Sequence, residues 1–343
     1  MKCAGRRVKI PTAAFYVFDA NSRYFSLTDG RFGSIIKLTK KQYWSLDNIK
    51  SDQNITFENA SLKFKELFYE SVSKRLRADV PIGTSLSGGL DSSSIVCTIS
   101  ELNKNISFAQ KSFSARFDNE SIDEGVYIDK IINKTNVDAY YTYPSVDDLI
   151  SQIDQIFYYQ EEPFISSSTI AQWEVMKLAK KENTVVLLDG QGADETLGGY
   201  VHYFSAYFRE LYLNGDKCYK KEIEDYQKRY GLEFSDDIFF KTESRFPHLF
   251  RIFRSIKRKL FGKNYLYKEL NEEFANNFSH SPSPYYLPKN LNEALRYSST
   301  QYGLEKLLRF SDRNAMAFSR EVRLPFLSHT LVEYLFSLPS SYK

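Results

Sequence analysis

The sequence is poor in the residues that mark several large classes of protein. It has three cysteines, Cys3, Cys97 and Cys218, among 343 residues, and their spacing fits neither a disulfide framework nor a metal-binding motif. Its four histidines are equally scattered and form no zinc-ligand pattern. These shortages argue against a disulfide-rich secreted protein and against a zinc site, and they favour a reducing compartment.

Excess charge and long apolar runs are also missing. The 46 Lys and Arg against 43 Asp and Glu leave a net charge of +3, which makes no case for nucleic acid or a membrane surface. No apolar run approaches the roughly 18 residues of a membrane span, and the opening MKCAGRRVKIPTAAF lacks the apolar stretch of a secretory signal. We therefore expect a cytoplasmic protein that has neither a membrane nor a nucleic acid as partner.

One stretch is locally basic: RIFRSIKRKLFGKNY, at residues 251–265, has basic residues with interleaved aromatics. Such a stretch could face RNA or an acidic surface. The chain as a whole carries so little excess charge that we interpret it as a solvated helix face.

What is present is the composition of a globular protein, with 42% hydrophobic and 26% charged residues over a length that suits two domains. Residues 1 to about 50 are β-rich, through AAFYVFDA and SIIKL, and SDQN then marks a linker. From SLKFKELFYESVSKRLRA, at residues 61–78, a helical pattern begins, and short apolar strands then alternate with helices. The four clearest strand candidates are PIGTSL, KSFSARF, DAYYTY and TVVLLD.

This alternation predicts an α/β fold with a parallel sheet of about five strands and helices on both faces. Ser145 and Asp148 have the spacing of a capping box at the start of one of these helices. After about residue 200 the strands are expected to stop. Residues 201–300 are predicted to be a mostly helical insertion, and GLEKLLRFSDRNAMAFS is a well-patterned helix in the C-terminal helical layer.

A glycine turn follows the first strand candidate, in SLSGGLDSSS at residues 85–94. Gly88 and Gly89 let backbone N–H groups approach an anion without a side chain in the way. The hydroxyls of Ser87, Ser92 and Ser93 add donors, and the following helix adds the positive end of its dipole. An ordinary strand-to-helix turn is the alternative, but the full motif after a strand predicts a loop that holds the pyrophosphate of ATP.

The same design recurs in VVLLDGQGADETLGGY at residues 185–200: a buried strand, a glycine turn, acidic residues and a helix. Turns at the carboxyl ends of parallel strands can face each other across one crevice. A carboxylate beside phosphate needs a cation, so Asp91 suggests Mg²⁺, and Asp194 would supply a second ligand opposite it. Glu195 could cap or orient its neighbours. An acid-capped helix explains Asp194 and Glu195 taken alone, but it does not explain the recurrence.

Together with SDRNAMAFSREVRLPFLSHTLVEYLFSLP, these two motifs resemble the synthetase domain of glutamine-dependent asparagine synthases, which are PP-loop ATP pyrophosphatases. The resemblance runs from about residue 60 to the end, and KLTKKQYWSL looks like the seam with that family's glutaminase domain. It implies an adenine nucleotide alpha-hydrolase-like fold for residues 55–343. Residues 1–50 would then be a remnant of the glutaminase domain and its seam.

The activity that the resemblance implies is amide formation driven by ATP and Mg²⁺. A carboxylate attacks the α-phosphorus of ATP, pyrophosphate leaves, and ammonia displaces AMP from the acyl-adenylate. The implied substrates are a small-molecule carboxylate, aspartate in that family, with ammonia or glutamine, and a glutaminase is a candidate partner. The implied roles are pyrophosphate binding by Ser87, Gly88, Gly89, Asp91 and Ser92, Mg²⁺ binding by Asp91 and Asp194, adenosine contact by Leu86, Ala115, Asp189 and Gly190, and catalysis by Gln191, Asp194 and Glu195.

The chain departs from the pattern of this family at both of its ends. The family's glutaminase nucleophile is a cysteine exposed as the first residue, whereas removal of Met1 here would expose Lys2, so we interpret Cys3 as an incidental thiol. The family's catalytic lysine lies beyond SLPSSYK, and Lys343 is no substitute for it. We therefore expect a chain that is truncated at both ends and does not hydrolyse glutamine.

Two further differences from the family pattern concern the carboxylate substrate that accepts the amide nitrogen. Gln191 stands where aspartate-amidating members commonly have glutamate, and an amide cannot act as a general base, although it could donate hydrogen bonds to a phosphate or adenylate oxygen. Ser166 stands where those members carry an arginine, a natural clamp for the substrate's free carboxylate. Two alternatives stay open: the same chemistry on a sugar, peptide or β-lactam-like acceptor, and an inactive nucleotide-binding subunit.

Overall fold

The computed structural model describes residues 14–17, 39–103, 110–119, 123–164, 166, 168–250, 252 and 286–343. It divides into two compact units, residues 1–197 with 296–343, and residues 198–295. The first unit contains the predicted sheet and both glycine turns.

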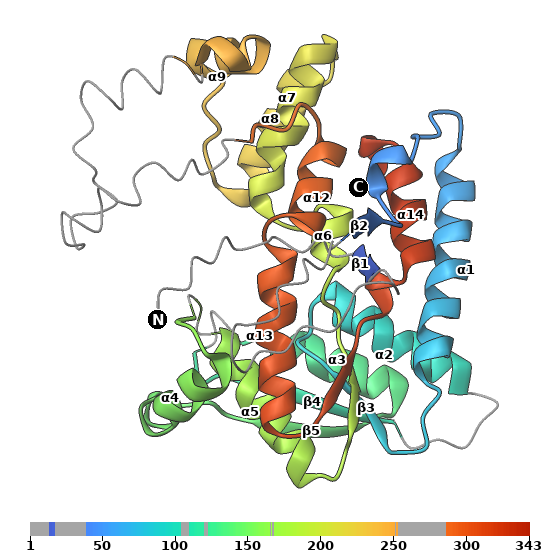
Figure 1. Cartoon of the computed structure of the whole chain (residues 1–343), viewed down its shortest axis with the longest axis vertical. Coiled ribbons are helices and arrows are strands. Elements are labelled where there is room, and N and C mark those ends of the chain that lie inside the picture. Colours follow the sequence, from blue (N-terminus) through green and yellow to red (C-terminus); the bar gives the residue numbers. More distant parts are fainter. Residues whose placement is uncertain are drawn as a thin grey trace, which may run out of the picture. The chain divides into compact units, whose positions relative to one another are not determined.

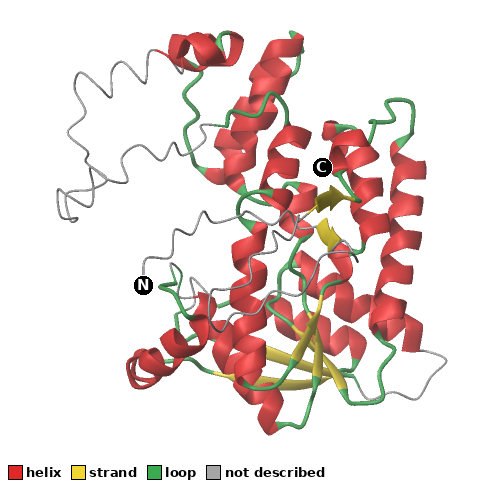
Figure 2. Ribbon diagram, viewed as in Figure 1, coloured by secondary structure: helices red, strands yellow, loops and turns green. Residues whose placement is uncertain are grey.

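A five-stranded parallel sheet forms the centre of the first unit, which confirms the predicted fold class (Figure 2). The strands are β3 (Ile82–Ser85), β4 (Lys111–Ala115), β5 (Asp138–Thr142), β6 (Val186–Leu188) and β7 (Glu321–Arg323). Their order is β5-β4-β3-β6-β7. The four clearest strand candidates, PIGTSL, KSFSARF, DAYYTY and TVVLLD, are therefore confirmed.

The order of the strands reverses at β3. The chain runs outward from β3 to β4 and β5, and then returns to place β6 on the other side of β3, with Thr84 opposite Leu188. In an open parallel sheet, a crevice for ligands forms at such a reversal, beyond the carboxyl ends of the two strands. The two glycine turns follow β3 and β6, so they lie at this reversal point.

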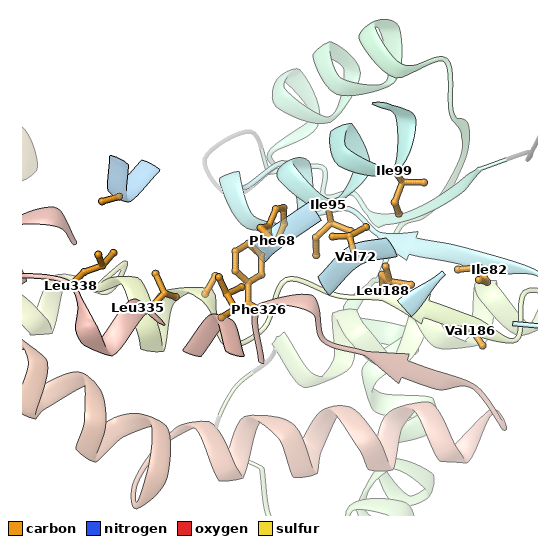
Figure 3. Close-up of a cluster of buried hydrophobic side chains, with 13 residues drawn as sticks. Phe68, Val72, Ile82, Ile95, Ile99, Val186, Leu188, Phe326, Leu335 and Leu338 are labelled. Carbon is orange, nitrogen blue, oxygen red and sulfur yellow. The ribbon is translucent and has the colours of Figure 1, made fainter. Parts of the chain in front are cut away.

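Helices cover both faces of the sheet because alternate strand residues are apolar on both sides (Figure 1). Val186 and Leu188 pack on one face against side chains of α1 and α2, among them Phe68, Val72 and Ile95 (Figure 3). Leu187 points to the other face, where Met176 of α5 and Ala315 of α13 lie. The main helices of this unit are α1 (Phe57–Arg75), α2 (Leu90–Leu102), α3 (Gly125–Thr135), α4 (Val146–Gln160), α5 (Ser168–Lys181), α6 (Ala193–Leu197), α13 (Leu304–Ala317) and α14 (His329–Ser337).

The capping box predicted at the start of α4 is present. The Asp148 amide donates to Ser145 Oγ at 3.1 Å, and the Ser145 amide donates to Asp148 Oδ2 at 2.9 Å. Two backbone donors that the helix leaves open are thus satisfied by side chains.

The segment before α1 is attached to the C-terminal part of the unit. Leu46, in the 3₁₀ turn η1 (Leu46–Asn48), is buried, and Trp44 Nε1 donates to Glu333 Oε1 of α14 at 2.6 Å. Further on, the Asp52 amide donates to Ser337 O at 2.7 Å. Upstream, β1 (Ala14–Val17) and β2 (Thr39–Gln42) pair antiparallel, whereas SIIKL lies outside the described residues.

The second unit is helical over its described residues. It contains the 3₁₀ turn η3 (Val201–Tyr203), α7 (Phe204–Asn214), α8 (Tyr219–Tyr230), α9 (Ile238–Arg245) and the first part of α12 (Leu291–Thr300). Its core is aromatic, with Phe208 fully buried against Tyr226 and Phe240. Arg209 is also buried, and its Nη1 donates to Pro288 O at 3.1 Å.

The expectation that strands stop after about residue 200 is wrong. β7 consists of three residues, Glu321–Arg323, and it pairs parallel with β6. It follows the well-patterned helix α13 and precedes the 3₁₀ turn η5 (Pro325–Leu327). Three residues are too few to show a periodic pattern in the sequence. This strand forms because it pairs with β6, which lies more than 130 residues earlier in the chain.

Substitution of Leu188 tests the packing of the sheet. Leu188 is fully buried, so Leu188→Ala should lower the free energy of unfolding by about 2 to 5 kcal/mol in urea titrations. Leu62 on α1 is 68% exposed, and the matched variant Leu62→Ala should change the free energy of unfolding by less than about 0.5 kcal/mol. Equal losses in the two variants would contradict the described core.

Candidate functional site

The first glycine turn is organised by its own hydroxyl groups. The Ser87 amide donates to Ser92 Oγ at 3.2 Å, and the Gly89 amide donates to Ser87 Oγ at 3.2 Å. The Ser92 hydroxyl in turn donates to Gly89 O at 3.3 Å. Residues 87–92 therefore close a compact turn at the start of α2, with Gly89 as the N-cap residue.

Gly88 is a position where a side chain cannot be placed. Its φ is +92°, and an added Cβ would lie 2.9 Å from the carbonyl oxygen of Glu124 and 3.3 Å from Ile128 Cγ1. The first turn of α3 thus forms a wall behind the loop. Glycine is needed here for both conformation and space.

The second glycine turn approaches the first closely. A Cβ added at Gly190 would lie 2.9 Å from Asp91 Cβ and 3.0 Å from the backbone nitrogen of Ser92. The turn is held by Asp189, whose backbone amide donates to Arg323 O at 3.0 Å and whose Oδ1 accepts from the Gln191 amide at 3.2 Å. The two predicted loops are therefore side by side at the reversal point of the sheet.

The carboxylates of the two loops influence each other. Burial first, and then the charges of Asp194 and Glu195, raise the pKa of Asp91 to about 6. Glu195 is buried, and its carbonyl oxygen accepts from Ser299 Oγ at 3.0 Å. Three acidic side chains thus share a partly dehydrated space, where a cation would lower the cost of their ionisation.

The donor set fits a magnesium ion that arrives with a phosphate ligand. Among the described residues, no group of three or more His, Cys, Asp or Glu side chains is arranged to hold a metal alone. Mg²⁺ is usually bound by one or two carboxylates and completes its shell with waters and substrate phosphate oxygens. Asp91 and Asp194 are suitable for that role.

The remaining predicted residues lie elsewhere in the first unit or outside the described residues. Leu86 is buried beneath the first loop, and Ala115 ends β4 next to β3. Ser166 Oγ lies 2.8 Å from Ser168 Oγ at the start of α5. Cys3 and the basic stretch, apart from Ile252, fall outside the described residues.

A polar network that the sequence did not reveal supports Asp189. Burial raises the pKa of Asp189, and hydrogen bonds, including one from Gln172, act in the opposite direction. Gln172 Nε2 donates to Ser311 Oγ at 3.0 Å, and Gln172 Oε1 accepts from Asn314 Nδ2 at 3.1 Å. Asn314 Oδ1 accepts from the fully buried Gln160 at 2.7 Å. No local motif marks these residues, because their partners lie on α4, α5 and α13.

Arg116 was also not singled out by the sequence. It follows Ala115 directly and pairs with Asp123, with Nη2 and Oδ2 2.9 Å apart. The sequence signal was an arginine at the end of a strand with an acidic residue shortly before the next helix. Glu321 and Arg323 also form an ion pair, with 2.7 Å between Oε1 and Nε.

The raised pKa of Asp91 predicts a pH-dependent change in stability. The folded-state pKa lies above the ordinary 3.8, so ionisation of Asp91 costs folding free energy as the pH rises from about 4 to beyond 6. Asp91→Asn should therefore be more stable than the wild type at pH 7.5, by about 1 to 2 kcal/mol after solvent screening. In thermal unfolding the gain should vanish near pH 4.

Asp148→Asn is the matched control with the opposite sign. Hydrogen bonds from the Ser145 side chain and backbone lower the pKa of Asp148, so this carboxylate contributes stability that is lost on acidification. Asp148→Asn should be less stable than the wild type at pH 7.5, and the difference should shrink in acid. An Asp91→Asn difference that does not vary with pH would contradict the described acidic cluster.

Comparisons with known proteins agree with this geometry. The family model described as asparagine synthase matches residues 63–343. A putative asparagine synthetase (glutamine-hydrolyzing) 2 of Methanocaldococcus jannaschii is 33% identical over 173 residues, which are 50% of this chain and 32% of that protein. Asparagine synthetase (glutamine-hydrolyzing) 1 of Bacillus subtilis is 25% identical over 288 residues, 81% of this chain and 44% of that protein.

The chain thus spans about a third to less than half of the length of these relatives. Among solved structures, the U34-tRNA thiolase NcsA of Methanococcus maripaludis covers 79% of this chain and 88% of its own. Its sequence identity is 14% and its TM-score is 0.32. Within the described residues, no helix is both long and apolar enough to cross a membrane. The family match extends over most of the chain and includes both glycine loops, and the chain therefore belongs to the asparagine synthase family.

Proposed function

We propose that this chain is the ATP-binding synthetase part of an amide-forming ligase. The observation that carries the proposal is the contact of the two glycine turns, where Gly190 packs on Asp91 and Ser92 at the reversal point of the sheet. Membership of the asparagine synthase family supports the same chemistry. In the reaction, a substrate carboxylate attacks the α-phosphorus of ATP, pyrophosphate leaves, and an amine displaces AMP from the acyl group.

The first loop would bind the pyrophosphate part of ATP. Its turn is already closed by the hydroxyls of Ser87 and Ser92, so little ordering is needed when the ligand arrives. The bound Mg²⁺ would neutralise charge on the leaving pyrophosphate, with Asp91 and Asp194 as its protein ligands. Leu86, Ala115, Asp189 and Gly190 would border the adenosine, and Glu195 would orient the acidic cluster from its buried position.

The proposed reaction requires the protein to position the substrates and neutralise charge, more than to supply a nucleophilic side chain. Gln191 would contribute as a hydrogen-bonding group, since its amide does not titrate in a useful range. Its Oε1 is a buried acceptor without a hydrogen-bond partner in the described structure, which suits a donor on the ligand.

The first candidate for the full reaction is asparagine synthesis from aspartate, with ammonia supplied directly or from glutamine by a glutaminase partner. Residues 55–343 would form the synthetase domain, with residues 201–300 as a helical insertion. Residues 1–50 would belong to the glutaminase side and its seam. The attachment of Trp44 and Leu46 to the C-terminal part of the first unit supports a seam near these residues.

A second candidate keeps the chemistry and changes the acceptor. Ser166 has no charge to pair with a free carboxylate, and its hydroxyl lies beside that of Ser168. Gln191 likewise replaces an acid with an amide. Both residues favour a carboxylate other than aspartate, such as one on a sugar, a peptide or a β-lactam-like precursor.

Exchange of labelled pyrophosphate into ATP tests the proposal. With Mg²⁺ and a panel of carboxylic acids, we expect exchange that depends on one acid, and the identity of that acid distinguishes the two candidates. Asp91→Ala should reduce exchange at least about 100-fold, because it removes a Mg²⁺ ligand. Asp79→Ala, at an exposed position before β3, is the control and should keep full activity.

Two results would contradict the proposal. ATP binding without exchange for any acid would indicate a nucleotide-binding subunit that does not turn over. Full exchange in the Asp91→Ala variant would refute the role of this carboxylate.

A further inference from the structure

The pair of Arg116 and Asp123 joins the end of β4 to the start of α3. Arg116 is the first residue after β4, and its backbone amide donates to Thr142 O of β5 at 2.8 Å. Its guanidinium donates to both oxygens of Asp123, with Nε 3.0 Å from Oδ1 and Nη2 2.9 Å from Oδ2. This paired geometry is the strong and directional form of an ion pair. Both side chains are mostly buried, at 21% and 14% exposed.

Asp123 also fixes the backbone on both sides of the pair. Its Oδ1 accepts from the Phe117 amide at 3.0 Å, and its Oδ2 accepts from the Gly125 amide at 3.2 Å. These bonds and the guanidinium lower the pKa of Asp123 to about 2, with the hydrogen bond from Arg116 as the largest cause. The carboxylate is therefore charged at any pH at which the protein would work.

The guanidinium is packed as well as paired. It lies over the ring of Tyr141, 5.6 Å from the centroid, and a Cβ added at Gly125 would fall 1.8 Å from Arg116 Nη2. Asp129 of α3 adds a more distant charge, with Oδ1 3.8 Å from Nη1. Arg116 is thus confined between β5 and the first turns of α3.

The start of α3 is the part of the molecule that bounds Gly88. Glu124 is the N-cap residue of α3, and its carbonyl oxygen would lie 2.9 Å from a Cβ at Gly88. Ile128, one turn further, is buried with Leu86 and Val96 beneath the same loop. A shift of this turn by a few tenths of an ångström would therefore change the space available to the pyrophosphate loop.

From these contacts we infer that Arg116 and Asp123 are positioning residues for the nucleotide phosphates, acting through Glu124 and Gly88. The inference rests on the proposed function, since it assigns pyrophosphate to the loop at Gly88. Neither residue is a catalytic group under this inference. Their pairing sets where α3 begins, and α3 sets the shape of the turn that receives the phosphate oxygens.

Equilibrium binding tests the inference without knowledge of the carboxylate substrate. Isothermal titration calorimetry with ATP, and separately with inorganic pyrophosphate, both with Mg²⁺, should be carried out on Arg116→Gln, Asp123→Asn and the double variant. We expect Kd for both ligands to rise about tenfold in each single variant. The double variant should be no weaker than the single ones, because the two residues act as one unit.

Two further variants separate positioning from general stability. Arg116→Lys keeps the charge but loses the paired geometry, so its Kd should lie between those of the wild type and Arg116→Gln. Lys177→Gln removes an ion pair with the buried Glu174 on α5, the helix that leads into the amino end of β6. It should lower the melting temperature without changing either Kd.

Three results would overturn the inference. Unchanged Kd values in folded variants with a lowered melting temperature would assign the pair a structural role only. Weaker binding in Arg116→Gln with unchanged or tighter binding in Asp123→Asn would mean that Arg116 contacts the anion directly. A wild-type chain that binds neither ligand would refute the proposed function as well, whereas binding without exchange would refute only turnover and leave the pair testable through Kd.

Discussion

The close contact of two glycine turns is the constraint on which the rest of the site depends. Gly190 lies against Asp91 and the backbone nitrogen of Ser92, so that a side chain at position 190 would have no room. This approach is possible because β3 and β6 are neighbours with opposite crossover directions. The sheet order thus determines that two loops far apart in the chain lie side by side.

The same contact creates the electrostatic character of the crevice. Bringing the turns together partly buries Asp91 and places it near Asp194 and Glu195, and the pKa of Asp91 rises to about 6 through burial first and then through these two charges. A like-charged cluster of this kind reduces stability in the absence of a cation. Such sites are retained where a ligand later supplies the missing charge, and for this chain we propose Mg²⁺ bound to a nucleotide.

Much of the fold could be predicted from local sequence. The strands before both turns, the capping box of Ser145 and Asp148 and the helix α13 were all predictable, because each is encoded by neighbouring residues. The glycine motifs also placed the two loops at the correct ends of their strands. What could not be predicted depends on distant partners: the three-residue strand β7, the network of Gln160, Gln172 and Asn314, and the pair of Arg116 and Asp123.

The most direct test of the central claim is a crystal structure of this chain with Mg²⁺ and a non-hydrolysable ATP analogue. We predict the β- and γ-phosphates between the two turns, with one Mg²⁺ about 2.1 Å from carboxylate oxygens of both Asp91 and Asp194. Triphosphate density at another place, or a metal bound to only one of the two turns, would contradict it.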